Sequence, residues 1–258
     1  MSQFALPNYD KARVAQQFGR AAARYTDHDR LQREVANVLY SQLAGQVQTL
    51  LDIGCGPGHH FPQLQHLAEQ YLGLDLAPQM LAQAQQSYPH AQFLLADMEA
   101  LPLAPQSVDC VYSNLAMQWA NHPEKLLAEW WRVLAPGGQW ATSTVLAGSL
   151  QPLTACFAAV DEVVHHNRWP ELSDYQDWSA KAAPGLQWQQ QTFTQYFTSL
   201  EQMLRELKGV GANYTVRPEQ GCYSRERLAR VREALEKHRN SDGLLELKWQ
   251  IGLAFGRK

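Results

Sequence analysis

The chain has 258 residues, of which 45% are hydrophobic and 18% are charged. These proportions are ordinary for a globular protein that buries a full core, either as one large domain or as one domain with an appendage. The net charge of −3 gives no overall positive field to attract nucleic acid or an anionic membrane. Apolar runs stay well short of the roughly 20 residues of a membrane span, and residues 1–10 lack the pattern of a signal peptide.

The four cysteines are far apart and form no C-x-x-C pair; they stand at positions 55, 110, 156 and 222. This spacing argues against a zinc site and against a disulfide framework. It is typical of a reducing compartment. We therefore expect a cytoplasmic protein that binds no metal.

Residues 8–44 show helical spacing of apolar side chains with few breakers, and basic residues outnumber acidic ones there. A helical arm of this kind is not needed by the part of the chain that follows. We expect residues 1–44 to form either a cap over an active site or an interface element.

From residue 48 to 145 the pattern alternates between strand and helix. We expect strands at 49–53, 71–76, 92–96, 108–113 and 139–145, and helices ending near 67 and spanning 78–87 and 123–134. Such a succession predicts an α/β fold with a mainly parallel sheet and helices on both faces. Ligands of these sheets bind at the carboxyl ends of the strands.

After residue 148 the regular alternation of predicted strands and helices ends. We expect a helix at 149–166, a loop-rich insertion at 167–185, a strand at 187–197, helices at 198–207 and 224–239, and a closing strand at 244–255. Ser199 and Ser224 are suited to cap the two helices. Gly209 and Gly211 break the chain between them.

A glycine loop follows the first strand. Asp52 is followed by Gly54, Gly56 and Gly58 in the spacing G-x-G-x-G, whereas a dinucleotide-binding loop reads G-x-G-x-x-G. The shorter spacing resembles that of S-adenosylmethionine (SAM) methyltransferases of the Rossmann-like class I fold, and this resemblance implies that Asp52 and the three glycines bind the cofactor. The alternative is an ordinary tight turn between a strand and a helix.

Polar residues close the next three strands in a pattern similar to that family: Asp75-Leu76, Asp97-Met98 and Asn114-Leu115. The resemblance implies that the Asp75 carboxylate accepts the two ribose hydroxyls of SAM. It implies that Asp97 meets the adenine amino group while Met98 packs on the ring, and that Asn114-Leu115 faces the methionine end. Each residue taken alone is also a common cap or turn residue.

The segment after the fourth strand reads Ser-Asn-Leu-Ala-Met-Gln-Trp at 113–119. It lacks the (D/N/S)-P-P-(Y/F/W) motif of the amide and adenine N-methyltransferases. A carboxylate acceptor is ionised at neutral pH and needs no general base. It does need a cation to orient it.

Five segments, at 18–25, 113–119, 148–150, 166–169 and 207–212, resemble the malonyl-[acyl-carrier-protein] O-methyltransferases of biotin synthesis. The resemblance spans nearly the whole chain. It implies a SAM-dependent carboxyl O-methyltransferase that esterifies the free carboxylate of a malonyl thioester, which primes pimeloyl synthesis. It also implies an arm at 1–44 and a methyltransferase domain at 45–258, with a substrate lid around 164–240.

Within this resemblance, Arg168 is expected to clamp the malonyl carboxylate through its two-pronged guanidinium. Tyr25 is expected to close over the site of methyl transfer, and Trp119 and Trp169 to form apolar walls. The plainer alternatives are a surface pair between Arg168 and Glu171, and ordinary packing for the three aromatic residues.

The acyl carrier protein of this family is acidic, so a transient partner of that charge implies a local basic face. The candidates are Arg20, Arg24, Arg30, Arg205 and Lys208. Each is also compatible with an ordinary solvated helix face.

Two other functions fit the first 145 residues. One is another small-molecule methyltransferase of the same fold, such as a quinone C-methyltransferase. The other is a non-catalytic SAM-binding regulator. The sequence leaves open whether carrier protein or coenzyme A bears the malonyl group.

Overall fold

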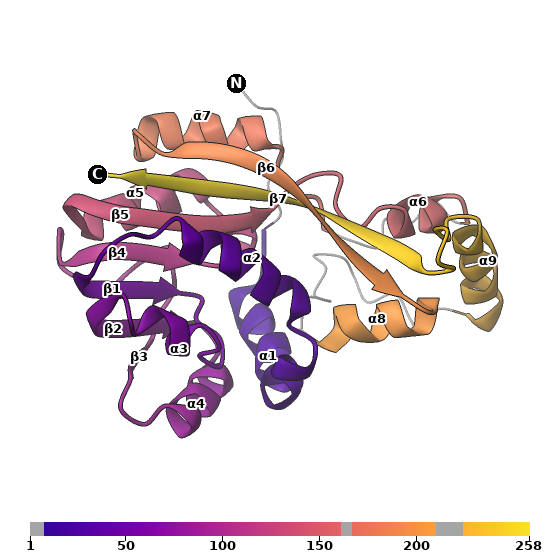
Figure 1. Ribbon diagram of the computed structural model, residues 1–258, viewed down its shortest axis with the longest axis horizontal. Coiled ribbons are helices and arrows are strands. Elements are labelled where there is room, and N and C mark those ends of the chain that lie inside the picture. The colour runs from indigo at the N-terminus through magenta and orange to yellow at the C-terminus, as the bar shows by residue number, and fades with distance from the viewer. Residues whose placement is uncertain (1–7, 161–166, 210–223) are drawn as a thin grey trace.

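The computed structural model describes residues 8–160, 167–209 and 224–258 (Figure 1). These residues contain a seven-stranded sheet in the order β3-β2-β1-β4-β5-β7-β6. The strands are β1 (Val47–Ile53), β2 (Ala68–Asp75), β3 (Gln92–Leu95), β4 (Val108–Ser113), β5 (Leu134–Val145), β6 (Gln187–Phe197) and β7 (Leu245–Arg257). The first five run parallel, β7 is antiparallel to β5, and β6 is antiparallel to β7. The predicted α/β fold with a mainly parallel sheet is confirmed.

The helices of the described residues lie on both sides of this sheet and around its edges (Figure 1). They are α1 (Lys11–Ala21), η1 (Ala22–Asp27), α2 (Arg30–Ser41), α3 (Phe61–Leu64), α4 (Pro78–Ser87), η2 (Met117–Trp119), α5 (Pro123–Val133), α6 (Leu153–Ala158), α7 (Leu172–Ala182), α8 (Leu200–Gly209) and α9 (Arg225–Glu236). Here η denotes a 3₁₀ helix. None of these helices is both long and apolar enough to cross a membrane.

The central strands are buried because helices cover both of their faces. In β1 the residues from Leu50 to Ile53 are all buried, including Asp52, as expected for a strand inside a parallel sheet. The edge strand β6 is different, since most residues from Gln187 to Thr192 are polar and exposed. An exposed polar edge disfavours pairing with another sheet.

Strands β6 and β7 extend beyond the rest of the sheet (Figure 1). Val145, the last residue of β5, pairs with Ile251. The preceding residues of β7, from Leu245 to Gln250, pair with β6. This two-stranded extension reaches toward α6, α8 and α9, and it lies on the same side of the molecule as the arm formed by α1, η1 and α2.

Three of the predicted elements differ clearly from the structure. Strand β5 begins at residue 134, directly after α5, and not at the expected 139. The expected helix at 149–166 is present among the described residues only as α6, and residues 161–166 lie outside them. The expected loop-rich stretch at 167–185 contains α7, which begins with a reciprocal capping box between Glu171 and Asp174. Tyr175 is buried, bonds to Thr144 at 3.0 Å and stacks on Trp188. This tertiary packing stabilises a helix whose polar composition suggested a loop.

Candidate functional site

A cleft of about 730 Å³, including the part open to solvent, lies at the carboxyl ends of the parallel strands. It brings together ten residues singled out from the sequence: Tyr25, Gly54, Gly56, Asp75, Leu76, Asp97, Met98, Asn114, Leu115 and Trp119.

The glycine loop forms one wall of the cleft. Gly54 and Gly56 have positive φ angles of 74° and 55°, a conformation that side chains with a Cβ rarely adopt. Their positions have different surroundings. A Cβ on Gly54 would lie 2.4 Å from the Cβ of Ala116, whereas a Cβ on Gly56 would meet no protein atom within 4 Å. Gly56 therefore leaves open space beside the cleft.

Asp75 closes β2 and is held in place by backbone donors. Its Oδ2 accepts a hydrogen bond from Gly56 N at 2.9 Å, and its Oδ1 accepts one from Ala77 N at 2.8 Å. Burial raises the pKa of Asp75, and these backbone bonds act in the opposite direction. A carboxylate oxygen has two lone pairs, so both oxygens remain able to accept a further bond from a ligand.

Asp52 and Gly58 do not line the cleft, contrary to the expectation that they contact a cofactor. The Asp52 side chain is 1% exposed and its Oδ2 accepts a bond from the Tyr71 hydroxyl at 2.7 Å. Burial raises the pKa of Asp52 to about 7. Gly58, with φ of 81°, faces the ring of Tyr88. Both residues therefore face protein side chains, and of this segment only Gly54 and Gly56 line the cleft.

The Asn114 side chain is fully engaged by the protein. Its Oδ1 accepts a bond from Ser143 Oγ at 2.8 Å, and its Nδ2 donates to Gln32 O at 2.8 Å. Nδ2 also lies 3.1 Å from His60 Nε2, and burial lowers the pKa of His60 to about 4. A neutral His60 therefore accepts from Asn114, and this network ties the end of β4 to the arm.

Leu115 adopts a positive φ of 50°, which is rare for a side chain of this size. Its N–H donates to Ser143 Oγ at 2.9 Å, and its carbonyl accepts from Gln118 Nε2 at 2.6 Å. Backbone strain held by surrounding bonds is a feature of functional sites. The N–H of Leu115 is thus engaged by the protein, while its carbonyl, which borders the cleft, keeps a second lone pair.

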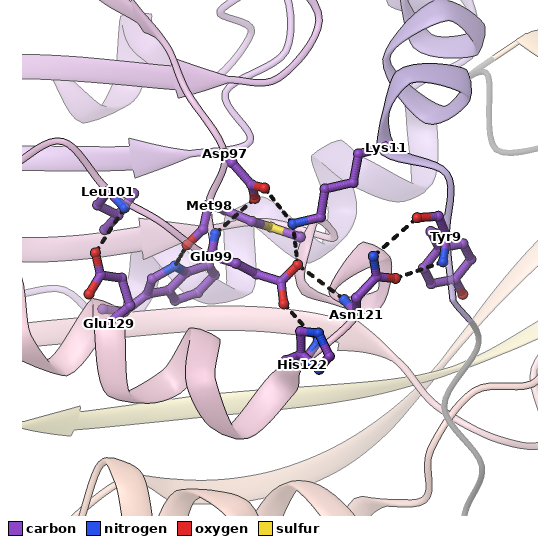
Figure 2. Close-up of polar contacts among 10 residues, drawn as sticks. Tyr9, Lys11, Asp97, Met98, Glu99, Leu101, Asn121, His122 and Glu129 are labelled. Atoms are coloured by element: carbon purple, nitrogen blue, oxygen red, sulfur yellow. Dashed lines mark hydrogen bonds and ion pairs between the residues drawn. The ribbon is translucent and has the colours of Figure 1, made fainter.

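The arm covers the cleft and is attached to it by charged groups (Figure 2). The Lys11 ammonium forms ion pairs with Asp97 and with Glu99. Glu99 is 4% exposed and accepts bonds from the backbone N–H groups of Asn121 and His122 at 3.2 and 2.7 Å. Burial disfavours the charged amine, but the bonds to both carboxylates raise the pKa of Lys11 above its ordinary value.

Two further contacts hold the arm. Tyr9 exchanges two hydrogen bonds with Asn121, from Tyr9 N to Oδ1 at 2.7 Å and from Nδ2 to Tyr9 O at 3.1 Å (Figure 2). At its other end, the buried Asp29 lies 2.6 Å from His59 Nδ1, beside the glycine loop. Sequence reasoning missed the pairing of Tyr9 with Asn121 because the two residues are 112 positions apart.

A second cavity adjoins the cleft and shares four lining residues with it: Phe18, Tyr25, Leu115 and Trp119. Its other walls come from the start of α2, from β5 and β6, from α8 and from Trp249 of β7. The Trp119 ring packs edge-on against Phe18 at a centroid distance of 5.4 Å. Burial raises the pKa of Tyr25, so its hydroxyl is protonated at neutral pH.

The remaining predicted residues lie elsewhere. Arg168 is exposed and lines neither cavity, and Trp169 is half-buried against the hydrophobic core. The candidates for a basic face are all exposed, namely Arg20, Arg24, Arg30, Arg205 and Lys208. Arg30 forms an ion pair with Glu34 at 3.0 Å. Among the described residues, no cluster of three metal-ligating side chains is present.

Comparison with known proteins gives the family. Residues 51–142 match the family described as "Methyltransferase domain". A malonyl-[acyl-carrier protein] O-methyltransferase of Enterobacter lignolyticus is 38% identical over 210 residues, covering 81% of this chain and 83% of that protein. The biotin biosynthesis bifunctional protein BioHC of Cellvibrio japonicus is 38% identical over 242 residues, which cover 91% of this chain but 48% of that protein.

Solved structures agree on the fold. The YcgJ protein of Bacillus subtilis superposes with a TM-score of 0.60 at 18% identity, covering 88% of this chain and 98% of that one. Fold similarity at this identity does not specify an acceptor, whereas the Enterobacter lignolyticus relative is 38% identical to this chain over 83% of its own length. The chain therefore belongs to the malonyl-[acyl-carrier protein] O-methyltransferase family of SAM-dependent methyltransferases.

Proposed function

We propose that this protein transfers the methyl group of SAM to the free carboxylate of a malonyl group held as a thioester on acyl carrier protein. The observation that carries the proposal is the shared wall between the two cavities. Phe18, Tyr25, Leu115 and Trp119 border both of them, so a donor in the cleft and an acceptor in the second cavity would meet there. The product would be the malonyl methyl ester that primes pimeloyl synthesis.

The residues of the cleft fit SAM, which supplies a methyl group activated by its sulfonium. Asp75 keeps acceptor capacity for the ribose hydroxyls. The space in front of Gly56 would admit the methionine portion close to the backbone. Asp97 and Met98, which border the same cleft, would hold the adenine.

The protein's own part in the reaction is to align the acceptor and exclude water. An ionised carboxylate is already a nucleophile, so a general base is not required. Holding the two reactants in contact supplies much of the rate enhancement in such transfers. The aromatic side chains of Phe18 and Trp119 provide the apolar surroundings, and the protonated Tyr25 hydroxyl is available to donate a hydrogen bond.

The arm and the later insertion have distinct roles in this proposal. The described part of the arm, residues 8–44, acts as a cap over the cofactor, and the described part of the later range, 167–209 and 224–240, acts as a lid over the acceptor. The rest of the ranges 1–44 and 164–240 lies outside the described residues. This later range also supplies strand β6, which pairs with β7 along its whole length. An acidic carrier protein would dock transiently on the exposed basic side chains of the arm and of α8, namely Arg20, Arg24, Arg30, Arg205 and Lys208.

The direct test incubates the protein with SAM and malonyl-carrier protein and seeks the methyl ester by mass spectrometry. Acetyl-carrier protein, which has no free carboxylate, is the matched negative substrate. Turnover of malonyl-coenzyme A at an equal rate would remove the carrier from the proposal. SAM binding without any ester would favour a regulator, and methylation of a quinone precursor would favour the C-methyltransferase.

Docking of the carrier is tested by ionic strength. Attraction between a basic face and an acidic carrier is screened by salt. We expect the KM for malonyl-carrier protein to rise when the salt concentration is raised from about 50 to about 500 mM, because the Debye length shortens several-fold over this range. A KM that does not change with salt would contradict electrostatic docking.

A further inference from the structure

The second cavity has few charged groups on its walls. Aromatic and aliphatic side chains make up most of the lining, together with glutamine amides. Among the described residues that line it, none is a lysine or an arginine, and the ionisable side chains besides Tyr25 are those of His28 and Glu206. In a cavity of this kind, a few polar groups fix the orientation of a mostly apolar ligand.

One side-chain oxygen on these walls is unpaired and has a fixed orientation. Oε1 of Gln118 is buried and has no hydrogen-bond partner among the described residues. The amide cannot turn over, because its Nε2 donates to Leu115 O at 2.6 Å, and an oxygen in that place would face another acceptor. Leu115 belongs to the wall shared with the cofactor cleft, so Gln118 is held next to that wall.

A second unpaired oxygen comes from the arm. Oε1 of Gln32, in the first turn of α2, is buried and likewise has no partner in the part of the chain that the structure describes. Its backbone is fixed, since Gln32 O accepts from Asn114 Nδ2 at 2.8 Å. Buried polar atoms without partners are rare in folded proteins and call for an explanation. Two unpaired oxygens on the walls of one cavity indicate a ligand that supplies hydrogen-bond donors.

Glu206 adds a third acceptor to this cavity. Nδ1 of His28 lies 2.6 Å from Oε2 of Glu206. Because an ionised carboxylate only accepts hydrogen bonds, Nδ1 is the donor of this pair whether the ring is neutral or charged, and Glu206 keeps further acceptor capacity. The indole N–H of Trp249 is not free to meet a ligand, since it donates to Gln195 Oε1 at 2.9 Å.

The thioester of the proposed function carries donors of the required kind. On a carrier protein or on coenzyme A, the malonyl group is bound through a pantetheine arm, a chain of methylene and methyl groups with one hydroxyl and two secondary amides. Each amide N–H loses water when the arm enters a cavity, and an N–H left without an acceptor weakens binding. The two glutamine oxygens are the acceptors that these N–H groups need.

We propose that the second cavity holds the pantetheine arm of the acceptor, and that Oε1 of Gln118 and Oε1 of Gln32 accept hydrogen bonds from its two amide N–H groups. This inference rests on the proposed function and names the part of the substrate that the cavity recognises. Gln118 adjoins the shared wall and therefore meets the amide nearer the thioester, which leaves the other amide to Gln32. The malonyl carboxylate then lies at the shared wall, facing the methyl group in the cofactor cleft.

The test removes the donors from the ligand and the acceptors from the protein. Malonyl-carrier protein is prepared with its natural arm and with a diester arm, in which oxygen replaces both amide N–H groups. In the wild type, we expect kcat/KM for methyl-ester formation to be about 10–100-fold higher with the natural arm, because the diester arm cannot form the two hydrogen bonds. In Gln118→Met and in Gln32→Met this ratio should fall by about 3–10-fold, since each variant lacks one acceptor.

The two variants complement each other. Gln118→Met also loses a bond to the backbone, but a purely structural disturbance would slow both arms equally and leave their ratio unchanged. Gln32→Met keeps its backbone bond and covers the case in which Gln118→Met does not fold. Gln65→Met is the matched control, because Gln65 is exposed, lines neither cavity and also donates from Nε2 to a carbonyl three residues earlier, that of Pro62, at 3.3 Å. Its ratio should equal that of the wild type.

The outcomes separate this inference from the proposed function. If the wild type forms no malonyl methyl ester from either arm, the proposed function fails. If it forms the ester from both arms at equal rates, water and not the arm satisfies the two glutamine oxygens, and this inference alone is overturned. An unchanged ratio in the folded glutamine variants overturns it as well.

Coenzyme A separates the two sources of the arm. Malonyl-coenzyme A has the same two amides, so it should show the same preference for the natural arm over the diester arm. A preference confined to coenzyme A would overturn the inference for the carrier protein.

Discussion

Lys11 of the arm and Asp97 at the end of β3 form an ion pair at the mouth of the cofactor cleft (Figure 2). Asp97 is the carboxylate that the family resemblance assigns to the adenine amino group. The same ammonium also contacts Glu99. A single side chain therefore attaches the arm to the part of the cleft expected to recognise the base.

Removing this charge should loosen the arm. Lys11→Met keeps the length of the side chain but leaves two neighbouring carboxylates without their cation, one of them buried. We expect a loss of about 1–3 kcal/mol in the free energy of unfolding. Amide hydrogen exchange in α1 should become faster. Arg13→Met is the control, because Arg13 is exposed and faces Asp10 of its own helix end at 3.5 Å. Equal exchange in the two variants would show that Lys11 does not hold the arm.

Asp75 should be needed for cofactor affinity. In Asp75→Asn an NH₂ group replaces one oxygen and faces the N–H of either Gly56 or Ala77, and the charge that would bind the ribose hydroxyls is lost. We expect SAM to bind about 10–100-fold more weakly by calorimetry. Asp177→Asn alters an exposed carboxylate on α7 and should bind SAM as the wild type does. Unchanged affinity in Asp75→Asn would remove Asp75 from the site.

The two glycines of the cleft should respond differently to alanine. Gly54→Ala places a Cβ 2.4 Å from that of Ala116, so the protein should lose about 2–4 kcal/mol of stability through strain and overpacking. Gly56→Ala meets no protein atom, so its cost in stability is limited to about 1 kcal/mol for the positive φ. Its methyl group borders the cleft, and SAM affinity should fall. Thermal unfolding and calorimetry measure the two effects, and equal losses of stability would contradict this difference.

His60 should make the folded protein sensitive to acid. Its pKa is about 4 when folded and about 6.5 when unfolded, so the unfolded chain binds more protons between these values. Stability due to neutral His60 is therefore complete above pH 6.5 and is lost as the pH falls toward 4, by up to about 3 kcal/mol. Asp52, with a folded pKa of about 7, acts in the opposite direction, since its contribution declines as the pH rises toward 7.

Comparison with His60→Gln isolates the histidine, because Asp52 is present in both proteins. Chemical denaturation at pH 4.5 and pH 7, values on either side of the ordinary histidine pKa of about 6.5, should show a smaller change of stability in the variant. Parallel pH profiles would show that His60 does not titrate as described.

The sequence predicted most strands and helices because the patterns that mark them are local in the chain. Apolar runs and glycines placed the strands from β1 to β4 within three residues of their observed bounds, whereas β5 begins five residues before its expected start. Helix α4 was predicted with its observed bounds, Pro78–Ser87. Ser224 caps α9 as expected, accepting from Arg227 N at 3.1 Å. The strand-end residues of the cleft were found for the same reason, since the end of a parallel strand is a position that the sequence marks.

The parts that escaped prediction depend on contacts between distant segments. Helix α7 is polar in composition and becomes recognisable once Tyr175 is seen packed on Trp188. His28 and Glu206 are 178 positions apart, and no local pattern pairs them. Asp52 looked like a ligand contact because it adjoins the glycine loop, but a buried strand position directs it to Tyr71.

The order of the strands also bears on how the protein is made. Strand β6 is synthesised before β7, yet within the described residues its partner in the sheet is β7 alone. Strand β6 therefore has no neighbour in the sheet until β7 has been synthesised. Trp249, a wall of the second cavity, belongs to that later strand. The second cavity thus stays incomplete until β7 has been made, whereas the residues that line the cofactor cleft all precede β6 in the chain.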